Sequence, residues 1–171
     1  MFDRDIDAVN LLNEQVKLRD KKGFWYNLIK DHIYNELCSK YSLNIHPRVE
    51  FGENVYIAHS FNILIGKTTK ICDNVCIYPN VSIIAKVTDD DILNEKNLRR
   101  HAIIGNGTVL GAGCTIIGNI TIGNNCFIAA GAIVTKDIPD NCLVKGINEI
   151  ITDYSFSIST KLDNRKMINK K

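Results

Sequence analysis

The sequence lacks the charge, the long apolar runs and the basic motifs that mark several protein classes. Its 171 residues carry 21 Lys and Arg against 19 Asp and Glu, a formal net charge of +2. That balance is too mild to indicate a nucleic-acid partner, and no basic motif interleaved with aromatic residues is present. No apolar run approaches the roughly 18 residues of a membrane span, and the first residues carry no secretion signal. We therefore expect a cytoplasmic protein with no nucleic-acid role.

The six cysteines lack the spacing of a metal or redox site. No two of them form a C-x-x-C pair, the usual sign of zinc ligands or redox cysteines. Four lie inside the repeat described below, where a small buried side chain fits; these are Cys72, Cys76, Cys114 and Cys126, and the other two are Cys38 and Cys142. We therefore favour structural cysteines over a metal or redox site, and expect no bound metal.

What the sequence has instead is a six-residue repeat over residues 104–139. The hexads read IGNGTV, LGAGCT, IIGNIT, IGNNCF, IAAGAI and VTKDIP. Each opens on an aliphatic residue, followed by small residues and often by Asn or Asp. A helix would need a period of 3.6 and a half-buried strand a period of two, so neither explains this frame. The repeat predicts a parallel β-helix in which three hexads make a coil and the aliphatic residues stack into one core.

Similar hexads come earlier in the chain. Aliphatic or aromatic residues are spaced by six from Ile45 to Ile57, and by six again from Ile65 to Ile83 after a slip of two residues. About thirteen hexads, or roughly four to five coils, are therefore expected. Glycine and asparagine suit the corners because they tolerate positive φ.

A short helical segment precedes the repeat. Residues 3–20 have apolar positions at Ile6, Val9, Leu12 and Val16, with acidic residues at the start and basic ones at the end, which predicts a helix. A second helix is expected from Phe24 to about Tyr41, with an apolar stripe that packs on the β-helix or on a neighbouring subunit. The predicted units are the helical segment 1–43, the β-helix 44–151 and a basic, solvated tail 152–171.

One long loop interrupts the repeat. The frame is lost for 21 residues between Ile83 and Ile104, and the loop, 86–101, ends in Arg99-Arg100-His101 where the hexads resume. Loops of this length without periodicity are usually functional or disordered. A histidine next to the coil wall is held in place, so we expect a functional loop.

These features together resemble a known family. The order of NIHP, a coil bearing His59, the segment ICDNVCIYPNVSI, a loop closing on Arg100-His101 and the final hexads is similar to serine O-acetyltransferases and the related bacterial sugar O-acetyltransferases. The resemblance covers residues 44 to about 146 and implies a left-handed β-helix, although crossover rules alone would predict a right hand. It also implies acetyl-CoA as co-substrate and a homotrimer with active sites between subunits.

The resemblance implies roles for individual residues. His59 matches the catalytic histidine that takes the proton of the acceptor hydroxyl, and Arg100 and His101 match the pair that lines the acceptor pocket, with His101 also a catalytic candidate. Histidine is mostly a free base near neutral pH, as this role requires. The pantetheine arm of acetyl-CoA would run along small residues of the coils, namely Gly111, Ala112, Gly113, Ala129 and Gly131.

The chain departs from serine acetyltransferases at two carboxylates. Asn44 and Ala58 stand where that family has aspartates that support the catalytic histidine and the amino group of serine, respectively. Asn44 can still accept a hydrogen bond at the acceptor site through its amide oxygen. The usual Val-Pro-Ala near the CoA adenine is replaced by Ile147-Asn148-Glu149. The absence of the two aspartates favours a sugar or polysaccharide precursor over serine as the acceptor.

We therefore expect an acetyl-CoA-dependent O-acetyltransferase of a sugar or surface-polysaccharide hydroxyl. The alternative is serine O-acetyltransferase, and a β-helix scaffold without catalysis is the alternative from another class. A zinc carbonic anhydrase shares the fold, but His46, His59 and His101 do not provide the closely spaced histidine pair that its metal needs.

Overall fold

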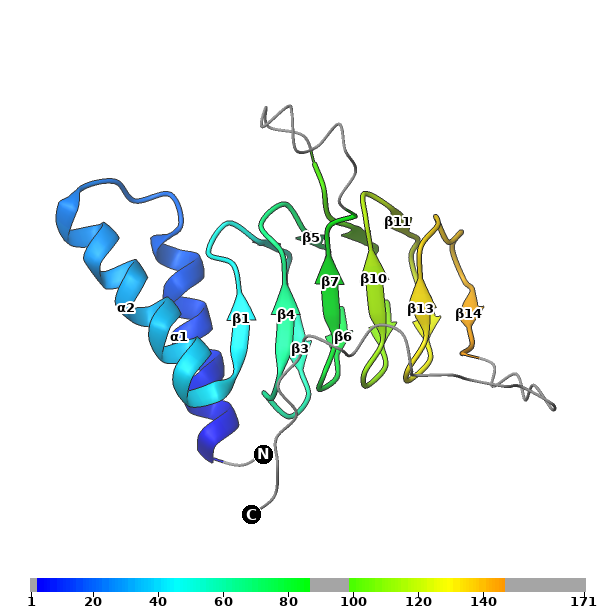
Figure 1. The fold of residues 1–171 in the computed structure, drawn as a ribbon, viewed down its shortest axis with the longest axis horizontal. Helices are drawn as coiled ribbons and strands as arrows, with labels where there is room; N and C mark the ends of the chain where they lie inside the picture. Colours follow the sequence, from blue (N-terminus) through cyan, green and yellow to red (C-terminus); the bar gives the residue numbers. More distant parts are fainter. Residues whose placement is uncertain (1–2, 87–98, 147–171) are drawn as a thin grey trace, which may run out of the picture.

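The computed structural model describes residues 3–86 and 99–146, which form two helices followed by a parallel β-solenoid (Figure 1). The helices are α1 (Asp3–Leu18) and α2 (Phe24–Tyr41), close to the predicted ranges. α2 ends where Ser42 adopts a left-handed conformation with φ of 57°, and its N–H bonds back to the carbonyl of Cys38. This C-cap directs the chain straight into the first strand.

Three parallel sheets form the walls of the solenoid, with a little over four coils in all. Sheet A contains β1 (Leu43–Ile45), β4 (Ile63–Ile65), β7 (Ser82–Ile84), β10 (Thr115–Ile117) and β13 (Ile133–Val134). Sheet B contains β2 (Glu50–Phe51), β5 (Lys70–Ile71), β8 (Ile103–Ile104) and β11 (Thr121–Ile122). Sheet C contains β3 (Tyr56–Ile57), β6 (Cys76–Ile77), β9 (Val109–Leu110), β12 (Phe127–Ile128) and β14 (Leu143–Val144). The predicted parallel solenoid is confirmed.

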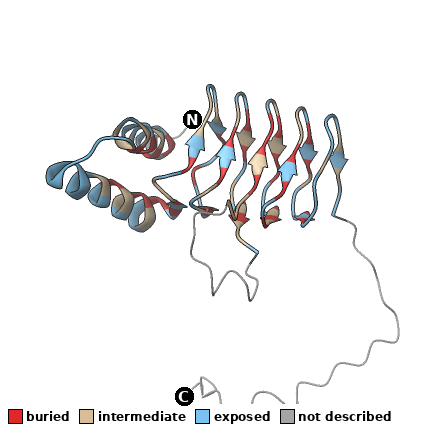
Figure 2. Ribbon diagram, turned by 90° about the horizontal axis from the view of Figure 1, so that it is seen from above, coloured by how far each residue is buried: buried red, intermediate tan, exposed pale blue. Residues whose placement is uncertain are grey.

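The residues that open the hexads stack into the core, as predicted. In sheet B, Ile71 pairs with Ile104 and Ile104 with Ile122, and all three side chains are buried. Figure 2 shows buried positions recurring from coil to coil along the solenoid. Such stacking gives each coil an apolar neighbour on both sides, so the core is continuous although every strand has only two or three residues.

Asparagine and glycine occupy the corners for the predicted reason. Between sheets B and C, Asn54, Asn74, Gly107, Asn125 and Asn141 all have φ between 52° and 66°. The asparagine side chains also form hydrogen bonds along the stack, as from Asn125 Nδ2 to Asn141 Oδ1 at 3.4 Å. Asparagine therefore serves twice, by tolerating the left-handed turn and by linking one coil to the next.

The register shows where the two irregularities lie. Ile57 pairs with Ile77 and Ile65 with Ile83, so the slip of two residues lies in the corner between β3 and β4, which contains His59. Ile83 and Ile104 lie on consecutive strands of one coil, β7 and β8, where the usual spacing is six residues. Their spacing of 21 residues therefore does not include an extra coil. The insertion is therefore 15 residues at one corner, and its residues 87–98 lie outside the described part.

The helices close the N-terminal end of the solenoid. The buried face of α1 consists of Asp5, Ala8, Leu12 and Gln15. Of the predicted stripe only Leu12 is buried, Val9 and Val16 are half-buried and Ile6 is exposed. Two residues of the buried face are polar because they bond to the solenoid, as described below. In α2, Ile33, Leu37 and Tyr41 are buried, whereas the apolar residues of its first half are exposed within the single chain; these are Phe24, Trp25, Tyr26, Leu28 and Ile29.

The cysteines of the described residues are all free thiols, and the described residues hold no cluster of three potential metal ligands. Burial raises the pKa of the Cys114 thiol to about 12, so it stays protonated and unreactive. Neither described helix is long and apolar enough to cross a membrane. The last described strand is β14, and the predicted tail 152–171 and Ile147-Asn148-Glu149 lie outside the described residues.

Candidate active site

His59 lies at the corner between sheets C and A that contains the two extra residues. Its backbone has φ of 53°, which is unusual for histidine, and its side chain is 68% exposed. Backbone strain of this kind is often found at functional sites. The longer corner therefore projects the imidazole away from the coil wall instead of burying it.

A carboxylate of α1 faces this histidine. Asp5 Oδ2 lies 3.9 Å from His59 Nδ1, and Asp5 Oδ1 accepts a hydrogen bond of 2.8 Å from the backbone N–H of Ser60. The Asp5 side chain is only 11% exposed. Sequence analysis took Asp5 for a charge at the start of a helix, and nothing in the local pattern indicates that it lies beside residue 59, which is 54 positions away.

His101 lies at a different corner, between sheets A and B, and its ring is fixed by Thr68. Thr68 Oγ1 accepts hydrogen bonds from the backbone N–H groups of Arg100 at 2.9 Å and His101 at 3.1 Å. The same oxygen is 2.7 Å from His101 Nδ1, and the Thr68 N–H also points at Nδ1 at 3.3 Å. Because Nδ1 accepts from a backbone N–H, the ring proton of the neutral imidazole belongs on Nε2.

The surroundings of His101 favour its neutral form. Burial, followed by the positive charge of Arg100 and by His46, lowers the pKa of His101. Burial, with Lys67 and Arg48, also lowers the pKa of His46, whose Nδ1 accepts the backbone N–H of Arg48 at 3.1 Å. A neutral His101 with its proton on Nε2 is a hydrogen-bond donor and not a base on that nitrogen.

Gly66 provides the space for the His101 ring. A Cβ atom at Gly66 would lie 1.9 Å from His101 Nε2, far inside any possible contact. The ring therefore lies against the bare backbone of the preceding coil. Sequence analysis missed both Gly66 and Thr68, although IGKTT has a glycine and a hydroxyl where the corner of the next coil must pass.

Of the other predicted acceptor residues, Arg100 adjoins His101, whereas Asn44 is engaged elsewhere. Asn44 is on β1, and its Oδ1 accepts a hydrogen bond from Tyr34 Oη at 2.8 Å. The amide oxygen that was expected to serve the acceptor site is thus bound to α2. The carboxylate that faces His59 is Asp5.

A single chain does not bring His59 and His101 together. His59 is on the edge between sheets C and A, and His101 is on the edge between sheets A and B, so the whole of sheet A separates them. Two edges of one prism cannot bind one small acceptor. A site that uses both histidines needs two chains side by side.

The predicted cofactor residues lie on the His59 edge. Gly111, Ala112 and Gly113 follow β9, and Ala129 and Gly131 follow β12, at the same corner in later coils. Their smallness also has a structural cause, because a Cβ at Gly111 would lie 2.6 Å from the carbonyl oxygen of Ile128. Gly113 and Gly131 both have φ of 70°. The edge is thus free of large side chains at these corners, whatever it binds.

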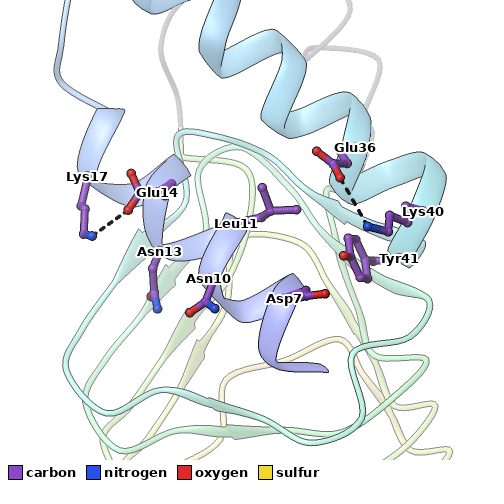
Figure 3. Close-up of a pocket in the computed structure, with 9 residues that line it drawn as sticks. All are labelled: Asp7, Asn10, Leu11, Asn13, Glu14, Lys17, Glu36, Lys40 and Tyr41. Atoms are coloured by element: carbon purple, nitrogen blue, oxygen red, sulfur yellow. Dashed lines mark hydrogen bonds and ion pairs between the residues drawn. The ribbon is translucent and has the colours of Figure 1, made fainter. Parts of the chain in front are cut away.

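A separate polar groove lies between the two helices and contains neither histidine. It has a volume of about 420 Å³, and Figure 3 shows the ion pairs of Glu14 with Lys17 and Glu36 with Lys40 along it. Asp7, two residues after Asp5, lines this groove and is exposed. Asp5 and Asp7 thus face different surroundings.

Comparisons with known proteins agree with this geometry. Residues 101–136 match the bacterial transferase hexapeptide (six repeats) family. The serine acetyltransferase of Synechococcus elongatus is 34% identical over 105 residues, 61% of this chain and 40% of that protein. The serine acetyltransferase of Staphylococcus aureus (strain Mu50) is 26% identical over 182 residues, 98% of this chain and 81% of that protein. The chain thus spans less than half of the first relative and most of the second.

A solved structure extends the comparison to three dimensions. Serine acetyltransferase from Brucella abortus, in complex with coenzyme A, superposes with a TM-score of 0.69 at 26% identity, over 86% of this chain and 55% of that one. Residues 101–136 of the solenoid thus match the hexapeptide-repeat transferase family, and the serine acetyltransferases compared above are homologues of this chain.

Proposed function

We propose that this protein is an acetyl-CoA-dependent O-acetyltransferase that transfers the acetyl group to the hydroxyl of serine, with His59 as the general base. The observation that carries the proposal is the position of His59. It projects toward solvent from a corner that is two residues longer than usual and has a strained backbone. A carboxylate lies beside it, and small residues occupy the same edge in later coils. Homology to serine acetyltransferases, one of them solved with coenzyme A, supports the same reaction.

The residue types fit acyl transfer. In the proposed reaction, His59 takes the proton of the acceptor hydroxyl as the hydroxyl oxygen attacks the thioester carbonyl of acetyl-CoA. The carbon–sulfur bond then breaks, and the thiolate of coenzyme A receives the proton from the imidazolium. This sequence balances without an oxidant, a reductant or a metal.

Arg100 and His101 suit an acceptor that carries a carboxylate. A guanidinium binds a carboxylate with paired, charge-assisted hydrogen bonds, and the neutral His101 can donate a further one from Nε2. We place these two residues around the acceptor. An amino acid offers a carboxylate for them, whereas a neutral sugar does not.

The sequence alone favoured a sugar because Ala58 supplies no anion for the ammonium group of serine. The Asp5 carboxylate lies within 3.9 Å of His59 and brings a negative charge to the site from another part of the chain, so the absence of an anion at Ala58 does not exclude serine. The relatives also support serine, and none of those compared supports a role in polysaccharide synthesis. We therefore prefer serine, the earlier alternative, to the sugar acceptor.

We further propose a homotrimer with three shared sites. His59 of one subunit would meet His101 of its neighbour across the groove between two solenoids, because one chain holds them on separate edges. The pantetheine arm would lie in the same groove, along Gly111, Ala112, Gly113, Ala129 and Gly131.

Release of free thiol from acetyl-CoA tests the proposal. The purified protein is assayed with serine, with threonine as a matched amino-acid control, and with a panel of sugars. We expect release with serine at a kcat/KM of at least ~10⁴ M⁻¹s⁻¹ and little with the sugars. Release with a sugar but not with serine would overturn the acceptor, and no release with any hydroxyl would overturn the activity.

A further inference from the structure

The contact between α1 and His59 goes beyond the residues assigned above. Asp5 belongs to the helical segment, yet it is buried against the corner between β3 and β4. Its two oxygens have different partners, with Oδ1 bound to the Ser60 N–H at 2.8 Å and Oδ2 facing His59 Nδ1 at 3.9 Å. The carboxylate is thus held by the residue next to the histidine that it faces.

The helix that carries Asp5 is firmly attached. Almost three turns further along, the Gln15 side chain donates a buried hydrogen bond of 3.1 Å to the carbonyl of Ile45 on β1. Ala8 and Leu12 lie between these two anchors on the same face and are buried. Spacing of 5, 8, 12 and 15 keeps all four side chains on one side of a helix. Asp5 therefore has a fixed position relative to the solenoid.

This arrangement favours one position of the ring proton of His59 over the other. A carboxylate beside Nδ1 favours the proton on Nδ1, which leaves the lone pair of Nε2 for the substrate. The separation of 3.9 Å is longer than a hydrogen bond, but such contacts are often long without substrate and tighten when it binds. The two positions where the family has its aspartates do not take this role, because Ala58 is apolar and the Asn44 oxygen is bound to Tyr34.

We propose that Asp5 is the positioning residue of His59, which keeps the imidazole in the tautomer with its proton on Nδ1 and stabilises the imidazolium formed during the reaction. This inference rests on the proposed function of His59 as the base. In this role the proton moves only between the acceptor hydroxyl, His59 Nε2 and the leaving thiolate. A residue of the helical segment thereby completes an active site built on the solenoid.

The substitution Asp5→Asn tests this role with little change of structure. The amide keeps an oxygen for the Ser60 N–H but turns an NH₂ group toward His59 Nδ1, which favours the other tautomer. We expect kcat for thiol release to fall by about 10²–10⁴-fold, while KM for acetyl-CoA changes less than about three-fold. Asp7→Asn, the same change two residues along at an exposed position, should leave kcat unchanged.

The tautomer itself provides a second measurement that needs no activity. Long-range ¹⁵N–¹H NMR of the histidine rings, with His59→Gln for assignment, should give Nδ1–H for His59 in the unmodified protein and Nε2–H in Asp5→Asn. An Nε2–H tautomer in the unmodified protein would overturn the proposal even if the variant failed to fold. A rise in KM for serine alone, with kcat and tautomer unchanged, would also overturn it and make Asp5 an anchor for the ammonium group.

The two proposals fail in different ways. If the protein acetylates no hydroxyl, the proposed function fails, whereas the NMR result still decides whether Asp5 sets the tautomer. If serine is acetylated and Asp5→Asn retains full kcat, the proposed function stands and the positioning role is wrong.

Discussion

At the scale of single residues, His59 carries the central prediction. Replacing it with alanine removes the proposed base without disturbing the core, because the side chain is largely exposed. We expect kcat to fall by about 10²–10⁴-fold with an unchanged unfolding midpoint. His32→Ala is the matched control, since His32 is exposed on α2 and lies 3.8 Å from Glu36 on the same helix. A folded His59→Ala protein with normal turnover would contradict the mechanism.

Gly66 offers a test of the His101 ring position. In Gly66→Ala, the new methyl group would occupy the place of Nε2, so the ring must move while the backbone stays the same. We expect kcat/KM for serine to fall by about 10- to 100-fold, as for other small displacements in active sites.

The effect of Gly66→Ala should run through His101 alone. In a double-mutant cycle, adding Gly66→Ala to His101→Ala should therefore cause little further loss. Additive losses would mean that the methyl group acts by another route.

Two half-buried histidines, His46 and His101, should make stability depend on pH. The folded-state pKa values of His46 and His101 are lowered by burial and by neighbouring positive charges, whereas the unfolded chain has the ordinary value of about 6.5. Below about pH 6.5 the unfolded chain therefore binds more protons than the folded one, so the free energy of unfolding falls as the pH falls. Urea unfolding at pH 7.5 and pH 5.5 measures this loss.

A double variant separates these histidines from the rest of the chain. His46→Gln with His101→Gln should reduce the difference in unfolding free energy between the two pH values, and His32→Gln should not. If the double variant kept the whole pH dependence, other groups would be its cause.

At the scale of elements, the corners of the solenoid depend on left-handed residues. Asn125 has φ of 52° and hydrogen bonds to Asn141 in the next coil. Asn125→Ala should lower the free energy of unfolding by about 1–2 kcal/mol because alanine resists this conformation. Asn125→Gly should cost less, since glycine tolerates it. Equal losses in the two variants, measured by urea unfolding, would show that the side-chain bond matters and the backbone does not.

The elements also show what a sequence can and cannot predict. The coils follow from the hexads because each hexad repeats the same local choice of apolar and corner residues. The two irregular corners were visible as breaks in the frame at residues 57–65 and 83–104. The helices were predicted too, but the buried face of α1 was not, since Asp5 and Gln15 look like surface residues until their partners on the solenoid are known.

The same limit applies to the candidate site. The family resemblance supplied His59, Arg100 and His101, but it could not supply Asp5 or Thr68, which act through contacts between distant segments. The inference from Ala58 and Asn44 against serine considered only the positions where the family has its aspartates. A carboxylate from a different element can serve the same place, and only the three-dimensional structure shows it.

At the scale of the whole molecule, the account requires a shared active site. One solenoid holds His59 and His101 on two edges separated by sheet A, so catalysis with both needs neighbouring subunits. Light scattering should give the mass of a trimer of 19.2 kDa chains. This assembly would also give each of three subunits the same pair of contacts, as closed symmetry requires.

Complementation between two inactive variants tests the shared site most directly. His59→Ala and His101→Ala chains are produced together with different tags, and mixed oligomers are purified on both tags. Every trimer that carries both tags has one groove in which His59 of one chain meets His101 of the other, so about one third of the sites would be intact. We therefore predict thiol release with serine at roughly that fraction of the unmodified protein, whereas each variant alone has almost none. Mixed oligomers as inactive as the separate variants would contradict a site shared between chains.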